Sequence, residues 1–206
     1  YQPAEEDYKI MPEILKLLIK YKTPMFISTK SDLILRDFDL IDKLSNIVPV
    51  RIASTITTTD EKLSSLIEPN VISPLKRFET LKEFKKTKAI VGVHTIPVMP
   101  FITESGLENI FIKTKENNLN YIICEVLNLR GECRKIFLNF VRKNFHEHYK
   151  KYLYIYNNNG KLKEEYKNKI HKRIKSLEEK YCLNYGLIDF EKVYIENEAN
   201  LFDYNL

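Results

Sequence analysis

Four short apolar runs, separated by longer stretches with helical spacing, mark the first 130 residues of this 206-residue chain. They predict strands near residues 24–29, 48–56, 89–96 and 120–127. Each run is apolar on both faces, which is typical of strands in a parallel sheet. Strands that alternate with helices predict βαβ units, so the fold class is α/β, with a barrel or a doubly wound parallel sheet as the outcome.

The stretches between the runs predict helices. Residues 7–21 carry apolar side chains that share one helical face: Ile10, Ile14, Leu17, Leu18 and Tyr21. Further helices are predicted at 37–46, at 105–117 and after the pair Ser73-Pro74, which suits an N-cap followed by a first turn.

The pattern changes after about Gly131, and we interpret residues 131–206 as a helical, basic C-terminal region. One helix is predicted around residues 136–141, and a long amphipathic helix with a Lys-rich outer face over 161–182. Residues 148–156 interleave tyrosines with lysines, which favours a strand with the tyrosines packed inward. The alternative is a surface on which nucleic-acid bases stack against tyrosines while lysines meet phosphates.

Positive charge is concentrated in the C-terminal region. The whole chain has a formal net charge of +5, whereas residues 143–185 contain eleven Lys or Arg and five Asp or Glu. Such a surface suits an anionic partner such as nucleic acid, but the solvated face of an amphipathic helix has the same composition.

Several classes of protein and site are disfavoured. No run approaches the roughly 20 apolar residues that span a bilayer, and the sequence has no Gly-x-Gly-x-x-Gly or Gly-x4-Gly-Lys motif. The three cysteines form neither a disulfide framework nor a Cys-x-x-Cys metal site, so we predict a cytoplasmic protein without metal ligands of its own. Cys124 lies in a predicted strand and is expected to be buried. His146 and His148 lack a third ligand.

Five segments carry a resemblance to a known family. They are Tyr1-Gln2-Pro3-Ala4-Glu5, Lys30 to Asp37, Ser54 to Thr58 with Leu66-Ile67-Glu68-Pro69, Ser73 to Phe78, and Ile96 to Pro100. In order and spacing they resemble the radical S-adenosylmethionine (SAM) enzymes of the spore photoproduct lyase and DNA-repair-photolyase-like group. The resemblance covers residues 1–130 and does not extend into residues 131–206.

The resemblance implies a partial (β/α)6 radical SAM barrel over residues 1–130, with the four predicted strands matching the family's third to sixth. In that family a Cys-x3-Cys-x-x-Cys motif holds a [4Fe-4S] cluster, and SAM yields a 5′-deoxyadenosyl radical that abstracts hydrogen from the substrate. The motif precedes the Tyr-Gln-Pro segment, so the cluster ligands are expected upstream of this chain. An apolar edge is then expected where the first two strands belong, or a second copy covering it.

The resemblance also implies that SAM binds at the carboxyl ends of the strands. The candidate cofactor-binding residues are Lys30, Ser31, Ser54, Thr55 and Arg77. Lys30 is the candidate for the SAM carboxylate and Ser54 for its amine or ribose. The structural alternatives are a surface Lys30, a Ser54 satisfied within the sheet, and an Arg77 paired with Glu68 or Glu79. A further group is placed near the same strand ends: His94, Pro97 and Glu125.

The sequence therefore favours a radical SAM enzyme, with a lyase or DNA-repair reaction as one option and no identified substrate. A hydrogen-donating role for Cys124 is a minor alternative to an inert thiol. Two other functions stay open: a non-catalytic module that binds nucleic acid through the basic C-terminal region, and a degenerate barrel with a structural role.

Overall fold

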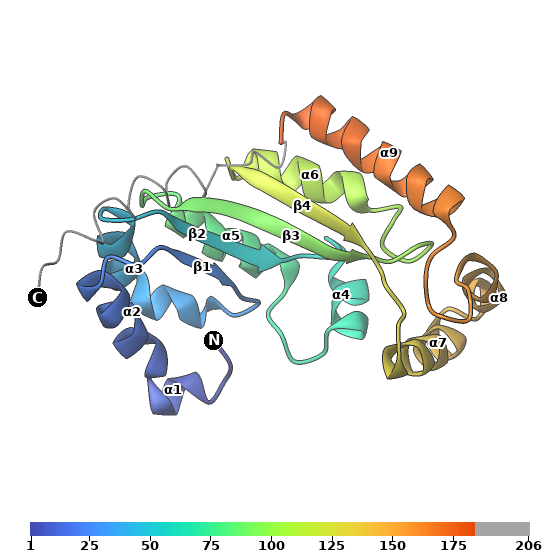
Figure 1. The fold of residues 1–206 in the computed structure, drawn as a ribbon, viewed down its shortest axis with the longest axis horizontal. Helices are drawn as coiled ribbons and strands as arrows, with labels where there is room; N and C mark the ends of the chain where they lie inside the picture. The colour runs from blue at the N-terminus through green and yellow to red at the C-terminus, as the bar shows by residue number, and fades with distance from the viewer. Residues whose placement is uncertain (184–206) are drawn as a thin grey trace, which may run out of the picture.

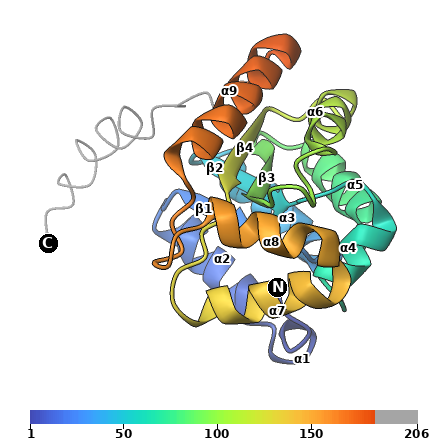
Figure 2. The same cartoon turned by 90° about the vertical axis from the view of Figure 1, so that its right-hand side faces the viewer.

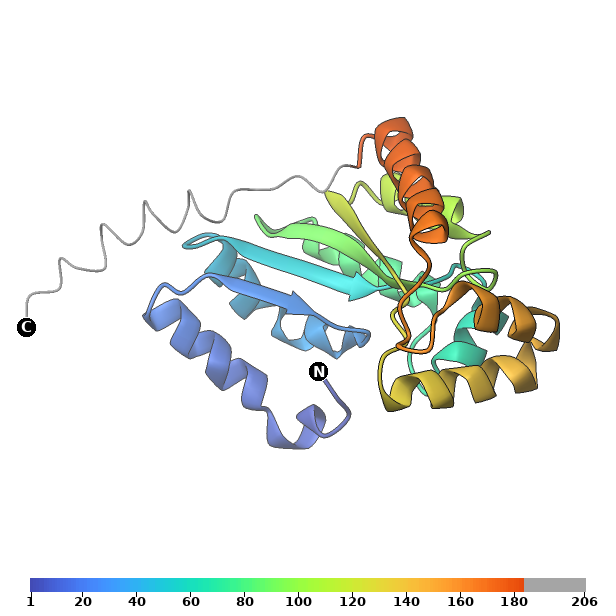
Figure 3. The same ribbon diagram turned by 45° about the vertical axis from the view of Figure 1, so that its right-hand side comes forward.

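A computed structural model describes residues 1–183 of the chain, and Figures 1 to 3 show its arrangement from three directions. The elements in chain order are α1 (Glu5–Tyr8), α2 (Ile10–Lys20), β1 (Met25–Ser28), the 3-10 helix η1 (Asp32–Asp37), α3 (Phe38–Ser45), β2 (Val50–Thr55), α4 (Glu61–Ile67), α5 (Pro74–Phe84), β3 (Ile90–Val98), α6 (Leu107–Glu116), β4 (Tyr121–Val126), α7 (Glu132–Asn144), α8 (His146–Ile155) and α9 (Glu164–Tyr181).

The four predicted strands are confirmed and form one sheet in the order β1-β2-β3-β4, with every neighbouring pair parallel. At least one helix follows each strand, as right-handed βαβ crossovers require. The fold class is α/β with an open parallel sheet. All four strands run toward the end of the sheet where α4, α7 and α8 lie (Figure 1).

The main hydrophobic core lies between one face of the sheet and the helices. Alternate residues of the strands point into it, among them Val50, Ile52, Val91, Val93 and Ile122, and side chains of α3, α5, α6 and α9 meet them. The intervening residues of the strands point to the opposite face, which we call the inner face: Phe26 and Ser28 from β1, Arg51 and Thr55 from β2, Gly92 and His94 from β3, and Tyr121 and Glu125 from β4.

The helix predicted over residues 7–21 is present and packs Leu15, Leu18 and Ile19 toward the core, but most of the predicted apolar face is exposed. Leu15 is the side chain that α2 buries completely, whereas Ile10, Leu17 and Tyr21 are 55%, 54% and 62% exposed. The described residues thus leave the expected apolar surface uncovered beside β1, the first strand of the sheet.

The strand predicted over residues 148–156 is wrong, because residues 148–155 belong to helix α8 and Tyr156 directly follows that helix. Helices α7 and α8 pack against each other across the carboxyl ends of the strands (Figure 2). Their second apolar cluster contains Met99, Leu129, Leu138 and Tyr152, and the Tyr152 hydroxyl donates to the Pro100 carbonyl at 2.5 Å. The tyrosines interleave with lysines here because a helix turns Tyr152 and Tyr156 inward at a spacing of four.

Helix α9 confirms the long amphipathic helix and buries Ile170, Ile174 and Leu177 against the main core. The basic range 143–185 and the region 131–206 both run past Leu183, so their last residues lie outside the described residues. No helix within residues 1–183 is long and apolar enough to cross a membrane.

Candidate site at the carboxyl ends of β1 and β2

Four of the five predicted site residues lie just at or after the ends of two neighbouring strands. Lys30 and Ser31 follow β1, and Ser54 and Thr55 end β2. The Thr29 amide donates to the Ala53 carbonyl at 3.0 Å, which extends the sheet pairing beyond β1. The Ser31 hydroxyl accepts the Leu33 amide at 3.2 Å and so caps η1.

Ser54 holds the two strand ends together. Its hydroxyl donates to the Thr29 carbonyl at 2.6 Å, and the side chain is buried. The Ser54 hydroxyl therefore donates its proton to the sheet, as in the structural alternative to cofactor binding. Thr55 lies on the inner face by strand alternation, and its carbonyl accepts a hydrogen bond from Arg77 at 2.8 Å.

Arg77, the fifth candidate, is 1% exposed and lies on α5. Its Nη1 also donates to Glu68 Oε2 at 2.6 Å, and its Nε donates to the Ile72 carbonyl at 2.9 Å. The other oxygen of Glu68, Oε1, lies 2.7 Å from Lys30 Nζ. Glu68 therefore contacts two of the predicted residues. The sequence indicated Glu68 as a possible partner of Arg77, but not of Lys30.

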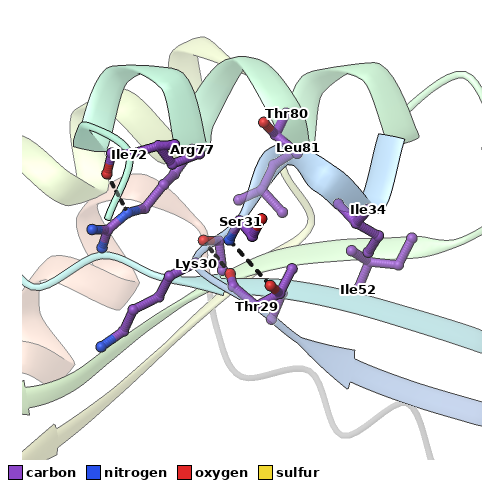
Figure 4. Close-up of a pocket in the computed structure, with 11 residues that line it drawn as sticks. Thr29, Lys30, Ser31, Ile34, Ile52, Ile72, Arg77, Thr80 and Leu81 are labelled. Atoms are coloured by element: carbon purple, nitrogen blue, oxygen red, sulfur yellow. Dashed lines mark hydrogen bonds between the residues drawn. The ribbon is translucent and has the colours of Figure 1, made fainter. Parts of the chain in front are cut away.

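The pocket between β1, β2 and α5 is lined by residues that include Thr29, Lys30, Ser31, Ser54 and Arg77, and the charged groups of Lys30 and Arg77 point toward the same side of it (Figure 4). Its volume of about 10 Å³ has room for one water molecule. The pocket itself is therefore too small for a cofactor-sized ligand.

The first two motifs of the resemblance contact each other. The Tyr1 hydroxyl donates to Asp37 Oδ2 at 2.8 Å, and Arg36 Nη2 donates to Glu5 Oε1 at 2.7 Å and to Asp37 Oδ2 at 2.8 Å. The Arg36 guanidinium lowers the pKa of the Glu5 carboxyl. These hydrogen bonds and ion pairs hold the N-terminal segment beside the carboxyl end of β1.

The inner face carries an aromatic and polar group of side chains around His94, which the sequence analysis placed near the strand ends without these partners. The His94 ring lies 5.4 Å from the Phe26 ring and 6.0 Å from the Tyr121 ring, measured between centroids. Its Nδ1 is 3.4 Å from Ser28 Oγ, and its Nε2 is 3.4 Å from the Tyr121 hydroxyl. Burial and the charge of Arg51 lower the pKa of His94, so the ring is neutral at pH 7.

Gly92 makes room for this cluster. A Cβ atom at Gly92 would lie 2.4 Å from the Tyr121 ring, so the ring packs directly on the backbone of β3. The alternation of side chains along β2, β3 and β4 could have placed Arg51, His94 and Tyr121 on one face, because in parallel strands alternate residues share a face. Glu125 is exposed at the end of β4, on the same face.

The described residues of the site offer cationic donors but no set of metal ligands. Within residues 1–183 no group of three or more His, Cys, Asp or Glu side chains could hold a metal ion. Burial raises the pKa of the Cys124 thiol to about 12, so this cysteine stays protonated. In contrast, Lys30 and Arg77 supply cationic donors, and the buried Nη2 of Arg77 has no hydrogen-bond partner among the described residues.

Comparison with known proteins finds relatives that are longer than this chain. No family model matches the sequence. An uncharacterized protein of Mycobacterium tuberculosis (strain H37Rv) is 28% identical over 185 residues, which are 89% of this chain and 54% of that protein. One of Methanocaldococcus jannaschii is 33% identical over 149 residues, which are 72% and 54% of the two chains. The chain thus spans about half the length of the curated relatives it matches.

The structural comparison decides the fold. A variant of spore photoproduct lyase superimposes on the chain with a TM-score of 0.60 and 12% sequence identity, covering 82% of this chain and 52% of that one. The chain has a radical SAM-like fold. Its open parallel sheet corresponds to part of the barrel of that lyase, and Lys30, Ser31, Ser54, Thr55 and Arg77 gather at the end of the sheet where such folds bind ligands.

Proposed function

We propose that this chain forms the SAM-binding part of a radical SAM enzyme. The observation that carries the proposal is the sheet of four parallel strands, similar to that of spore photoproduct lyase, with polar and cationic residues at the carboxyl ends of β1 and β2. The name of that neighbour supports a lyase-type reaction, and the proposal leaves the substrate open.

The roles of individual residues follow from their positions. Lys30 binds the SAM carboxylate, because its ammonium group is a compact donor at the end of β1 with its side chain 41% exposed. Ser31, Ser54 and Arg77 shape the loops that hold Lys30 in place, and Thr55 faces the ligand from the inner face. A cluster bound elsewhere in the whole protein would supply the electron that cleaves SAM into methionine and a 5′-deoxyadenosyl radical.

The cluster ligands belong, in this proposal, to a region that the chain does not span. Two observations support this. The matched relatives are about twice as long as the part they share with this chain. In addition, the outward face of α2 and the side chain of Phe26 on β1 leave apolar surface exposed where further βα units would pack.

Titration of the 206-residue chain with SAM, followed by calorimetry, tests the binding role. We expect Lys30→Ala to weaken binding by about tenfold or more, because loss of a charged hydrogen-bond partner costs about 1.5–3 kcal/mol. Lys16→Ala is the matched control, since Lys16 pairs with Glu13 on the surface of α2. Equal affinities of wild type and Lys30→Ala would remove Lys30 from the site.

Arg77→Ala belongs in the same series, and we expect it to weaken SAM binding less than Lys30→Ala, because Arg77 already bonds to three groups of the protein. Arg77 is buried and has three partners, so this variant is expected to lose stability first. Its affinity is therefore measured only below its unfolding temperature, where the folded fraction is known from circular dichroism.

The catalytic half of the proposal is tested on the whole protein, reconstituted anaerobically with iron and sulfide. The expected result is a [4Fe-4S] absorbance and an electron paramagnetic resonance signal that changes when SAM is added. If the whole protein binds no cluster, the enzyme proposal fails, and the non-catalytic nucleic-acid-binding module becomes the better proposal.

A further inference from the structure

Glu68 lies between two cations that come from different loops. It directly follows α4, and its carboxylate contacts Lys30 Nζ through Oε1 at 2.7 Å and Arg77 Nη1 through Oε2 at 2.6 Å. The Glu68 side chain is only 11% exposed. One carboxylate therefore connects the segment after β1, the segment after β2 and helix α5.

The three charges do not balance. Glu68 supplies one negative charge, and Lys30 and Arg77 supply two positive charges. This group of three residues therefore has a net positive charge. Arg77 is fully buried and needs the carboxylate, because an uncompensated charge in that position is strongly unfavourable. The excess positive charge is thus available to a ligand at Lys30, whose side chain is the most exposed of the three.

Arg77 and Lys30 also differ in freedom to move. Arg77 is fixed by the carbonyls of Ile72 and Thr55 in addition to Glu68. Lys30, whose flexible stem ends in a compact ammonium group, has Glu68 as its ion-pair partner. Without that partner, the ammonium group would sample many rotamers, and binding a ligand would require ordering it again.

We propose that Glu68 is a positioning residue: it holds the Lys30 ammonium at the carboxyl end of β1, ready for the carboxylate of a ligand. This inference rests on the proposed function, in which that carboxylate belongs to SAM. The ligand carboxylate binds to the Lys30 ammonium beside Glu68, and its negative charge balances the excess positive charge of Lys30, Glu68 and Arg77. Glu68 acts through Lys30 and does not itself touch the ligand carboxylate.

The first test needs no SAM. The ammonium group of Lys30 is observed by ¹⁵N NMR in the uniformly labelled 206-residue chain, where Lys30→Arg identifies its signal. A held ammonium exchanges its protons with water slowly, so we expect the signal in wild type and its loss in Glu68→Gln. Glu13→Gln is the control, because it removes the exposed ion pair of Glu13 with Lys16 and should leave the Lys30 signal unchanged.

The second test is a double-mutant cycle on SAM affinity. Glu68→Gln is expected to bind SAM roughly tenfold more weakly than wild type, and Lys30→Ala more weakly still. Because Glu68 acts through Lys30, the double variant should match Lys30→Ala to within about twofold. Decarboxylated SAM separates positioning from general damage: its affinity should be the same in wild type and in Glu68→Gln.

The outcomes separate this inference from the proposed function. If wild type binds no SAM, the proposed function fails, and the NMR result alone decides whether Glu68 holds Lys30. If the Lys30 signal persists in Glu68→Gln, the positioning role is overturned. Tighter SAM binding by Glu68→Gln, additive losses in the double variant, or equal losses with decarboxylated SAM would overturn it as well. Should Glu68→Gln unfold, Glu68→Asp, which keeps the charge on a shorter stem, replaces it in both tests.

Discussion

The two edges of the sheet, at β1 and at β4, present surfaces of different chemistry. Beside β1, helix α2 turns Ile10, Leu17 and Tyr21 outward, and Phe26 of β1 is also exposed. Beside β4, helix α9 packs its apolar residues against α6 and β4, and its outer face is rich in lysine. Figure 3 shows α2 and α9 at opposite sides of the sheet.

The groove at the end of β4 extends this contrast. It has a volume of about 390 Å³ and is lined mainly by charged and polar residues, among them Glu125, Arg130, Lys161, Lys167 and His171. Charged and polar side chains are well hydrated and need no protein partner, whereas a contiguous exposed apolar patch usually marks a contact with protein. The β1 side is therefore suited to further polypeptide, and the β4 side to solvent or a polar ligand.

The largest expected effect is on the free energy of unfolding. Ile174 of α9 is buried in the main core, so Ile174→Ala should cost about 2–5 kcal/mol. Leu17→Ala on the outward face of α2 should stay within about 0.5 kcal/mol, because that side chain already contacts water. Urea unfolding of both variants measures the difference. Equal losses would mean that α2 and α9 are covered alike in solution.

A smaller effect is expected on self-association. The exposed apolar surface beside β1 should make the 206-residue chain associate at high concentration, which sedimentation equilibrium detects. Leu17→Glu should weaken this association by about tenfold or more, since burying one leucine contributes about 1.5–3 kcal/mol. Leu153→Glu, at a half-exposed leucine of α8, serves as the control. A wild-type chain that stays monomeric at all concentrations would contradict the prediction.

The strands could be predicted from the sequence because each run is apolar on both faces. The structure buries both faces of β2 and of most of β3, whereas β1 leaves Phe26 exposed. Helix α8 could not, because the interleaved tyrosines and lysines of residues 148–156 suit both a strand and a helix that buries Tyr152 and Tyr156. The apolar face of α2 was recognised, but its direction depends on which elements surround it, and no pattern within residues 7–21 contains that information.

The candidate site was predicted in a similar way. The motifs identified Lys30 and Arg77, since charged residues next to apolar runs stand out in a sequence. Their shared partner Glu68 lies 38 positions after Lys30, and the contact depends on how the segment after β2 folds back. The pair Arg36 and Glu5 likewise forms only when the N-terminal segment meets η1.

Nucleic-acid binding at the basic helices, if the β4 side has an anionic partner, should depend strongly on salt. Each neutralised phosphate releases counterions, so a log–log plot of affinity against salt should have a slope of several units. Replacing Lys150, Lys151, Lys172 and Lys175 by Ala should reduce the slope. Several basic residues already have local partners, such as Lys180 with Glu108, so the affinity is expected to be low. No binding at about 50 mM salt would identify these helices as a solvated face.

The smallest expected effect is the dependence of stability on pH through His94. Its pKa is lowered in the folded protein, so the unfolded chain binds the proton more readily, and the stability present above pH 6.5 is lost as the pH falls toward the folded pKa. The loss between pH 7.5 and pH 5 should be smaller in His94→Asn than in wild type. His171→Asn, at an exposed histidine of α9, should lose as much as wild type. If His94→Asn loses as much stability between pH 7.5 and pH 5 as wild type, the His94 ring is not held neutral on the inner face.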